Sequence, residues 1–287
     1  MNGTIFERAK TRTLLCAHRG VSGGNVPCNT TAAFAGALAQ GADIIELDVA
    51  KSRDGEFFVF HPGMEHAHLH SRKPIALMKA SEVRRRRFVN QDDTKTQFGV
   101  ERLDDVLDFL KGKCYINVDK YWTDVPGITQ VIRKTGVEEQ VIVKSGFSEK
   151  ALRQLQEHAP DLMYMPIIRD RDDVTQRLLD GGVRCIGAEV LFREESAPVA
   201  SDAYIEAMHQ KGLLLFVNAI VYDYKEVLSA GHTDDVSVAG APEKGWGWLL
   251  DKGFDIIQTD WCGMVKSYME NRNLLCKFQF ERIADSK

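Results

Sequence analysis

The sequence predicts one (β/α)8 barrel, the TIM-barrel fold, with a small insertion after the second strand. The chain has 287 residues, and barrels of this kind commonly use roughly 250 residues around one core. Short runs rich in Val, Ile and Leu alternate with helical patterns from one end of the chain to the other. No Gly-rich phosphate loop follows the first strand-like run, which disfavours the rival fold, a doubly wound open sheet.

Eight strand-like runs carry the barrel prediction. Their apolar residues suit strands that are buried on both faces, as barrel strands are. In chain order they are Thr13–His18, Ile44–Val49, Cys114–Asp119, Val141–Lys144, Met163–Ile168, Cys185–Val190, Leu213–Asn218 and Asp255–Thr259. A further run, Phe57–Phe60, follows an Asp54-Gly55 turn, so we expect it to form a hairpin arm with the second strand.

Helical patterns fill the gaps between these runs. Thr31–Gln40 is rich in Ala and ends at Gly41, a common helix stop. Leu103–Leu110 repeats apolar residues at helical spacing. Two more helices are expected after capping serines: from Ser148 to about Glu157, and from Ser201 to Gln210.

Residues 62–101 interrupt the alternation. They are too many for an ordinary connection and are rich in His, Arg, Asp and Gln. We expect a small insertion with one helix around Ala80–Arg87, lying over the mouth of the barrel. The run Arg84–Arg87 would be a solvated face of that helix. Since no repeat or linker is evident, residues 1–287 are expected to form a single domain.

Composition disfavours several classes of protein. A net charge of -4 argues against a nucleic-acid binder, and six cysteines without a CxxC pair fit a reducing cytoplasm. Met1–Arg12 lacks an apolar run of signal-peptide length. No stretch approaches the roughly 20 apolar residues of a membrane span. We therefore expect a cytoplasmic protein without stable membrane insertion; the sequence leaves a homo-oligomer open.

Acidic residues mark two predicted strand ends, where barrel enzymes place their reacting groups. Glu46 and Asp48 are two residues apart, so both side chains point to the same face of their strand. Asp119 ends the neighbouring run. Three acids with open positions suit a hard cation such as Mg²⁺ or Ca²⁺. Barrel-mouth acids bonded to Arg or Lys would show the same spacing, so both interpretations stay open.

Two histidines and an arginine stand at other strand ends. His18 and Arg19 follow the first run, and Gly20 allows a sharp turn there. Arg can hold a phosphate through two parallel hydrogen bonds. His18 and His61 suit an acid–base pair, because imidazole titrates near neutral pH. A structural hydrogen bond is the alternative for either histidine alone.

A specific block of motifs occupies the N-terminal part of the chain: Ala17-His18-Arg19-Gly20, Asn29-Thr30 with Ala32-Ala33-Phe34, Gly41-Ala42-Asp43, Glu46-Leu47-Asp48, Asp54-Gly55 and Phe60-His61. This block resembles the glycerophosphodiester phosphodiesterase family of the PI-PLC-like phosphodiesterase superfamily. Weaker matches follow at Leu103–Leu110, Asn117-Val118-Asp119, Gly253-Phe254-Asp255 and Thr259-Asp260. The resemblance therefore covers nearly the whole chain.

This resemblance implies a barrel enzyme that uses a divalent cation, Mg²⁺ or Ca²⁺, to hydrolyse small glycerophosphodiesters to glycerol 3-phosphate and an alcohol. Carried over residue by residue, it gives acid and base roles to His18 and His61, the phosphate to Arg19, and the metal to Glu46, Asp48 and Asp119. A lysophospholipase D-type or sphingolipid-cleaving enzyme on the same barrel is the rival activity, and would need an apolar groove. A non-catalytic binding protein is the second rival. Either water or the neighbouring glycerol hydroxyl is the attacking group.

The chain departs from the family pattern at a few positions. Cys28 stands where Glu is common, and Pro62 stands where Asp is common. Asp119 replaces Glu, which shortens the arm of the third acid. Tyr121 falls where a Lys usually lies, although Lys120 is adjacent.

Further polar residues complete the predicted substrate site. They are Lys120, Lys144 at the end of the fourth run, Glu189 in the sixth and Asn218 at the end of the seventh. Lys144 and Glu189 would replace lost contacts to the headgroup. A structural ion pair is an equally good interpretation of either residue.

Overall fold

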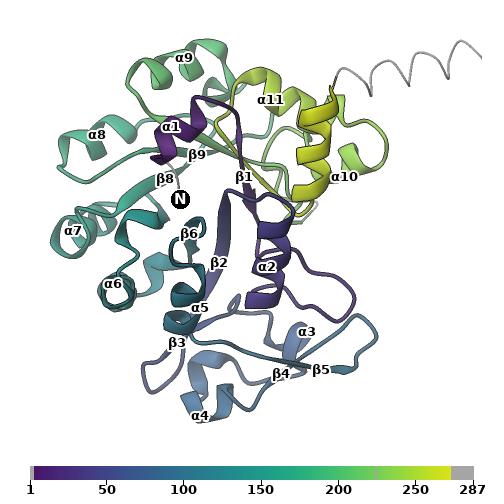
Figure 1. The fold of residues 1–287 in the computed structure, drawn as a ribbon. Coiled ribbons are helices and arrows are strands. Elements are labelled where there is room, and N and C mark those ends of the chain that lie inside the picture. Colours follow the sequence, from purple (N-terminus) through teal and green to yellow (C-terminus); the bar gives the residue numbers. More distant parts are fainter. Residues whose placement is uncertain (1–2, 224, 273–287) are drawn as a thin grey trace, which may run out of the picture.

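Eight parallel strands close into a barrel in the computed structural model, which describes residues 3–223 and 225–272 (Figure 1). The barrel closes because the first strand pairs with both the second and the last. The strands are β1 (Leu14–Ala17), β2 (Ile44–Lys51), β6 (Tyr115–Asp119), β7 (Val141–Gly146), β8 (Met163–Arg169), β9 (Gly187–Leu191), β10 (Leu214–Asn218) and β11 (Ile256–Thr259). Each one overlaps a predicted run, so the predicted barrel is confirmed. The hairpin arm is also confirmed, as β3 (Phe57–Val59) pairs antiparallel with β2.

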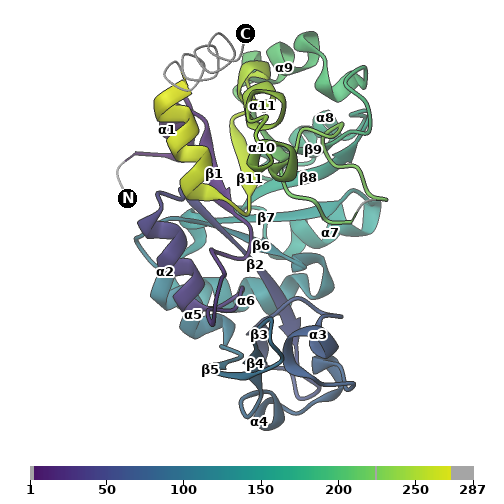
Figure 2. The same cartoon turned by 90° about the vertical axis from the view of Figure 1, so that its right-hand side faces the viewer.

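Helices connect the strands and cover the outside of the barrel (Figures 1 and 2). The four predicted helices are present as α2 (Thr31–Ala39), α5 (Leu103–Leu110), α7 (Glu149–His158) and α9 (Asp202–Gln210). Ser148 and Ser201 cap α7 and α9 through their side chains, as expected. Other connections contain α6 (Val125–Thr135), α8 (Thr175–Asp180), α10 (Asp234–Val238) and α11 (Trp248–Lys252), and residues 262–272 are helical. Short helical turns occur at Tyr121–Thr123, Glu138–Gln140, Pro198–Ala200 and Glu243–Gly247.

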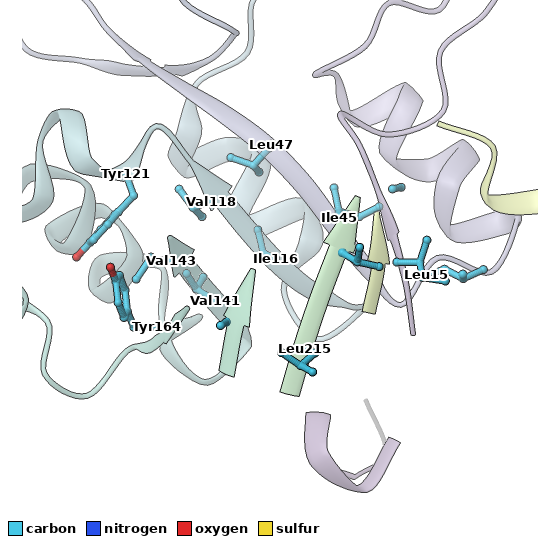
Figure 3. Close-up of a cluster of buried hydrophobic side chains, with 14 of the residues drawn as sticks. Leu15, Ile45, Leu47, Ile116, Val118, Tyr121, Val141, Val143, Tyr164 and Leu215 are labelled. Carbon is cyan, nitrogen blue, oxygen red and sulfur yellow. The ribbon is translucent and has the colours of Figure 1, made fainter. Parts of the chain in front are cut away.

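The apolar core has two layers, because side chains alternate between the two faces of each strand. Residues such as Leu15, Ile45 and Val118 point outward against the helices (Figure 3). Residues such as Ile44 fill the lower barrel interior, where Ile5 of α1 (Ile5–Ala9) joins them. The apolar filling occupies one end of the barrel interior. The opposite end, where the strands finish, carries the polar side chains of the interior.

The insertion differs from the prediction in its structure and position. The expected helix around Ala80–Arg87 ends at Val83 as α4 (Ala80–Val83), and Arg87 begins a strand. Phe88, in that strand, is buried, so this segment pairs as a hairpin instead of extending the helix. The elements are α3 (Glu65–Leu69), a 3₁₀ turn (Ile75–Leu77), α4, β4 (Arg87–Val89) and β5 (Lys95–Gly99).

The insertion lies beside the barrel and not over its mouth, as Figure 2 shows. Its apolar residues, including Met78 and Phe88, form a separate cluster with Phe58 and Phe60 of the hairpin arm. That contact holds the insertion against the extension of β2 and β3. No residue of 62–101 lines the central cavity at the strand ends, within the part of the chain that the structure describes.

The remaining expectations concern disulfide bonds and membrane-spanning helices. Cys16, Cys28, Cys114, Cys185 and Cys262 are free thiols, and Cys276 lies outside the described residues. Among residues 3–223 and 225–272, no helix combines the length and the apolar character that crossing a bilayer requires.

Candidate active site

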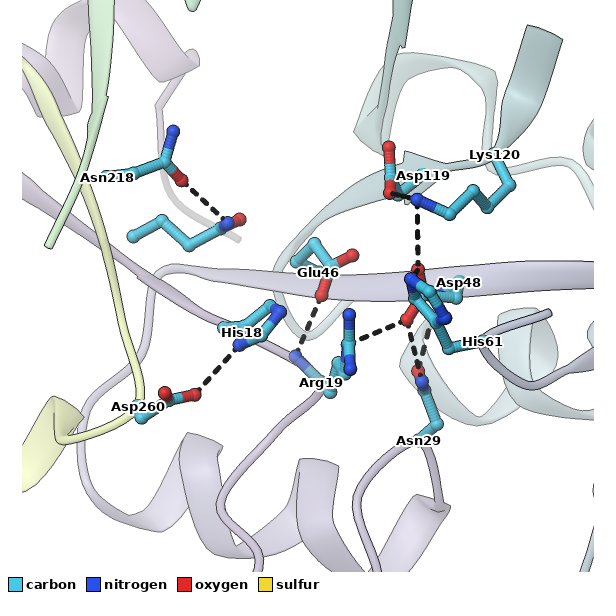
Figure 4. A network of polar contacts seen from close by, with 11 residues as sticks. His18, Arg19, Asn29, Glu46, Asp48, His61, Asp119, Lys120, Asn218 and Asp260 are labelled. Carbon is cyan, nitrogen blue, oxygen red and sulfur yellow. Dashed lines mark hydrogen bonds and ion pairs between the residues drawn. The ribbon is translucent and has the colours of Figure 1, made fainter. Parts of the chain in front are cut away.

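Three carboxylates converge at the mouth of the barrel (Figure 4). β2 carries Glu46 and Asp48 on its inner face, and Asp48 lies opposite Asp119 in the neighbouring strand β6. One oxygen from each acid lies within 4.8 Å of the other two. Burial, and then the charge of Asp48, raise the pKa of Glu46 to about 8. Burial and the neighbouring carboxylates thus both disfavour the charged form of Glu46.

The donor set fits a hard divalent cation. Asp48 Oδ1 is buried and accepts no hydrogen bond from any residue that the structure describes. His61 Nε2 and Lys120 Nζ each lie 3.9 Å from it. A buried carboxylate oxygen without a partner is costly, and Mg²⁺ and Ca²⁺ prefer carboxylate oxygens. A cation among the three acids would supply the missing partner.

The same acids also contact cationic side chains. Arg19 Nε lies 2.9 Å from Asp48 Oδ2, and its backbone N–H donates to Glu46 Oε2 over 2.8 Å. Lys120 Nζ lies 2.8 Å from Asp119 Oδ2. The ion-pair interpretation of these acids is therefore realised, and the acidic cluster that a cation would need is present as well. The cations place positive charge at the edge of the cluster, where an anionic phosphate would approach.

A left-handed turn after β1 gives Arg19 its position. Arg19 and Gly20 have φ values of 56° and 78°, so the turn predicted at Gly20 is present. A Cβ on Gly20 would lie 2.7 Å from the backbone carbon of Ala33 in α2. Only glycine fits there, and the turn brings the backbone N–H of Arg19 to Glu46.

The two histidines occupy opposite electrostatic environments. His18 Nδ1 lies 2.8 Å from Asp260 Oδ1. Burial lowers the pKa of His18, but the hydrogen bond to Asp260 and the charge of Glu46 raise it above the ordinary value. Burial lowers the pKa of His61, and this effect exceeds the rise in pKa that the charge of Asp48 produces. His18 therefore favours the protonated state and His61 the neutral state.

Polar residues on the far strands form a connected floor. Lys144 Nζ lies 2.6 Å from Glu189 Oε2. Asn218 Nδ2 donates to Glu189 Oε1 over 2.6 Å, and Gln258 Nε2 donates to Asn218 Oδ1 over 2.8 Å. Burial opposes the charge of Lys144, but Glu189 and Asp119 raise its pKa above the ordinary value. The predicted residues Lys144, Glu189 and Asn218 thus contact one another at the base of the cavity.

All ten predicted site residues lie at one end of the barrel. Nine of them line a cavity of about 270 Å³, and Asp48 lies against it through its contacts with Arg19 and the other acids: the nine are His18, Arg19, Glu46, His61, Asp119, Lys120, Lys144, Glu189 and Asn218. A groove of about 690 Å³ adjoins this cavity at His18 and Arg19. A site with an acidic cluster that could hold a metal ion, basic side chains bonded to that cluster and two histidines has the parts that phosphoryl chemistry needs.

Comparison with known proteins identifies the family. The model of the glycerophosphoryl diester phosphodiesterase family matches residues 18–218, which is more than half of the chain. The chain belongs to this family.

Individual family members resemble the chain over different lengths. A glycerophosphodiester phosphodiesterase of Caldanaerobacter subterraneus is 31% identical over 165 residues, which span 53% of this chain and 65% of that relative, slightly less than two thirds. A solved glycerophosphodiester phosphodiesterase of Agrobacterium tumefaciens is 25% identical, with a TM-score of 0.63 over 89% of this chain and 99% of that one. A solved glycerophosphoryl diester phosphodiesterase of Parabacteroides distasonis is 18% identical and shares the fold, with a TM-score of 0.74 over 95% and 93% of the two chains.

The departure from the family pattern at Tyr121 has a local structural explanation. Lys120 adopts a left-handed conformation with φ of 59°. Because side chains alternate along a strand, the residue after Asp119 would otherwise point away from the mouth. The left-handed residue returns the Lys120 ammonium to Asp119. Tyr121 is instead buried, and its hydroxyl lies 2.6 Å from Thr129 Oγ1 of α6.

The other departures lie at the edge of the site. Cys28 borders the adjoining groove, and burial raises the pKa of its thiol to about 11, so it stays protonated. Pro62 is exposed. Neither residue bonds an acid of the cluster.

Asn29 and Asp260 contact predicted site residues but had no assigned role in the sequence analysis. Asn29 Nδ2 donates to Asp48 Oδ2 over 2.9 Å, and Asp48 N–H donates back to Asn29 Oδ1 over 3.2 Å. Asp260 contacts His18, as described above. Asn29 lies in a loop and so escapes a search of strand ends, although it belongs to a quoted motif. Asp260 does follow a strand, so an acidic residue at a strand end was the signal that could have identified it.

Proposed function

We propose that this chain is a divalent-cation-dependent phosphodiesterase that hydrolyses glycerophosphodiesters to glycerol 3-phosphate and an alcohol. The observation that carries the proposal is the convergence of two histidines with opposite pKa shifts beside three acids. Pairs of titratable groups with divergent pKa values are typical of acid–base catalysis. Membership of the family supports the same chemistry.

The acidic and the basic side chains have different tasks in this proposal. Glu46, Asp48 and Asp119 hold the cation, which when bound would neutralise charge on the phosphoryl oxygens. Arg19 and Lys120, which already contact these acids, bind the phosphate from the other side. Lys144, Glu189 and Asn218 act as a group that contacts the substrate from the floor.

Each histidine carries out one of the two proton transfers in this proposal. His61, with its lowered pKa, is neutral and accepts a proton from the attacking hydroxyl. His18, with its raised pKa, is protonated and donates a proton to the leaving alcohol. Its Nδ1 atom is engaged by Asp260, so Nε2 is the ring atom free for this transfer.

An assay of product release tests the proposal. The full chain is incubated with a panel of glycerophosphodiesters and lysolipids, in excess chelator and after addition of Mg²⁺ or Ca²⁺. Glycerol 3-phosphate should form only with the metal. Release of lysophosphatidic acid as the main product would favour the rival lysolipid activity, and binding without turnover would identify a non-catalytic protein.

Replacing Asp260 with Asn should change the pH dependence of catalysis. His18 must be protonated to act as an acid, so kcat/KM falls as pH rises through the pKa of His18. Asp260 raises this pKa, and its removal should therefore move the alkaline limb of the pH profile to lower pH. We expect kcat to fall roughly 10–100-fold, as for other outer-shell partners. An unchanged alkaline limb would show that Asp260 does not tune His18.

A further inference from the structure

We infer that the leaving alcohol of this enzyme is uncharged and has an apolar body. The inference rests on the proposed function and deepens it. It starts from the half of the cavity that lies across the barrel from the acids of β2 and β6. We call this half the apolar chamber; it is lined by Ile167, Leu191, Ile220, Tyr222 and Leu228, and Trp122 stands at its border beside Lys120.

The chamber offers hydrocarbon surface to a ligand. Ile167 and Leu191 come from the carboxyl ends of β8 and β9, and Ile220 follows β10. At the rim, Trp122 and Tyr222 are 41% and 60% exposed. Large apolar side chains that remain exposed beside a cavity commonly mark a ligand-binding groove. The chamber therefore extends the reacting site with an apolar wall that no catalytic step requires.

The charged groups next to the chamber are already paired. Arg169 Nη1 lies 3.1 Å from Glu226 Oε2 at the rim, and the floor carries the Lys144–Glu189 pair at 2.6 Å. Glu189 and Glu226, the carboxylates on this side of the cavity among the residues that the structure describes, thus each have a cationic partner. A positively charged headgroup would have to displace Arg169 or Lys144 to reach a carboxylate.

The Trp122 side of the rim is also unsuited to a cationic headgroup. Quaternary ammonium groups are usually bound over aromatic faces. Lys120 Nζ lies 5.2 Å from the ring centre of Trp122, so a cation already occupies the vicinity of that ring. Choline or ethanolamine would meet repulsion from this ammonium group.

A hydroxyl-rich alcohol is also less suited to the chamber than a hydrocarbon one. Polyols need several donors and acceptors, but the Asn218 amide already uses one N–H for Glu189 and one acceptor position for Gln258. The aliphatic side chains of the chamber, Ile167, Leu191, Ile220 and Leu228, offer no hydrogen-bonding group. The glycerol arm of the substrate therefore faces elsewhere, and the chamber receives the variable alcohol.

A homologous series of substrates tests the inference. The full metal-loaded chain is assayed with methyl, ethyl, propyl and butyl esters of glycerol 3-phosphate, and with the choline and inositol esters. The higher alkyl alcohols have similar leaving-group strength, so a trend among them reports on binding. We expect kcat/KM to rise up to roughly fourfold per methylene that enters the chamber. The butyl ester should exceed the choline ester roughly tenfold.

The variant Leu228→Glu tests whether the apolar chamber causes the preference for alkyl alcohols, and Leu77→Glu is its control. Leu228 is half-buried in the chamber, whereas Leu77 is an exposed residue of the insertion. The new carboxylate at position 228 should raise the choline-to-butyl ratio of kcat/KM roughly tenfold, and Leu77→Glu should leave it unchanged. Leu228→Ala, a milder change that preserves folding, should flatten the alkyl series.

The outcomes separate the inference from the proposed function. A flat alkyl series, or a preference for choline, with normal release of glycerol 3-phosphate overturns the inference and leaves the proposed function intact. Failure to cleave every ester in the presence of metal overturns both.

Discussion

Replacing His18 or His61 with Ala is expected to lower kcat by roughly 10²–10⁴-fold, the usual contribution of a positioned acid or base. The two histidines have opposite pKa shifts, as an acid and a base working together require. Steady-state kinetics on the best glycerophosphodiester measures the effect. The double variant should cost little more than the worse single one, because the two groups act as a unit.

His158→Ala is the matched control for the histidine variants. His158 lies at the end of α7 and lines none of the cavities described for this chain. Its removal should leave kcat unchanged, and calorimetry should show that His18→Ala and His61→Ala still bind the metal. If either active-site variant keeps near-normal kcat, that histidine is structural and the acid–base pair is wrong.

Asp48→Asn is expected to lower both metal affinity and kcat by roughly 100-fold or more, beyond the 10–100-fold typical of outer-shell partners. Asp48 is fully buried within the acidic cluster, and one of its oxygens lacks a hydrogen bond from the described residues. An amide cannot supply the lost charge. Metal titration by calorimetry and by restored activity measures the change. Full activity of the parent in excess chelator would contradict the metal role altogether.

Variants at Asp119 and Asn117 distinguish a metal ligand from a residue that only orients its neighbours, because both residues lie on the same strand. Asp119→Ala should lose the metal, whereas Asp119→Glu should keep part of the activity because the carboxylate is preserved. Asn117 shares the inner face of β6, is fully buried and is neutral, so Asn117→Ala should affect metal affinity less. If only Asn117→Ala weakens metal binding, the third ligand has been placed on the wrong residue.

The sequence alone determined the strands, because buried strands need continuous apolar runs such as Val141–Lys144. It also determined that Glu46 and Asp48 share one face of β2, since residues two apart in a strand point to the same side. The prediction that strand ends meet at one mouth followed from the barrel itself. For these reasons the candidate residues of the site could be named before their positions were known.

The tertiary structure decided what local pattern cannot encode. Barrel closure pairs β1 with β11 and so brings Asp260 to His18 across more than two hundred residues. A positive φ at Lys120 reverses the side expected from strand alternation. The insertion lies beside the barrel because its own apolar cluster packs on the hairpin arm. Lys144 and Glu189 are paired because β7 and β9 lie on either side of β8 and both side chains point into the barrel. Each of these outcomes depends on contacts between distant segments, which exist only once the chain has folded.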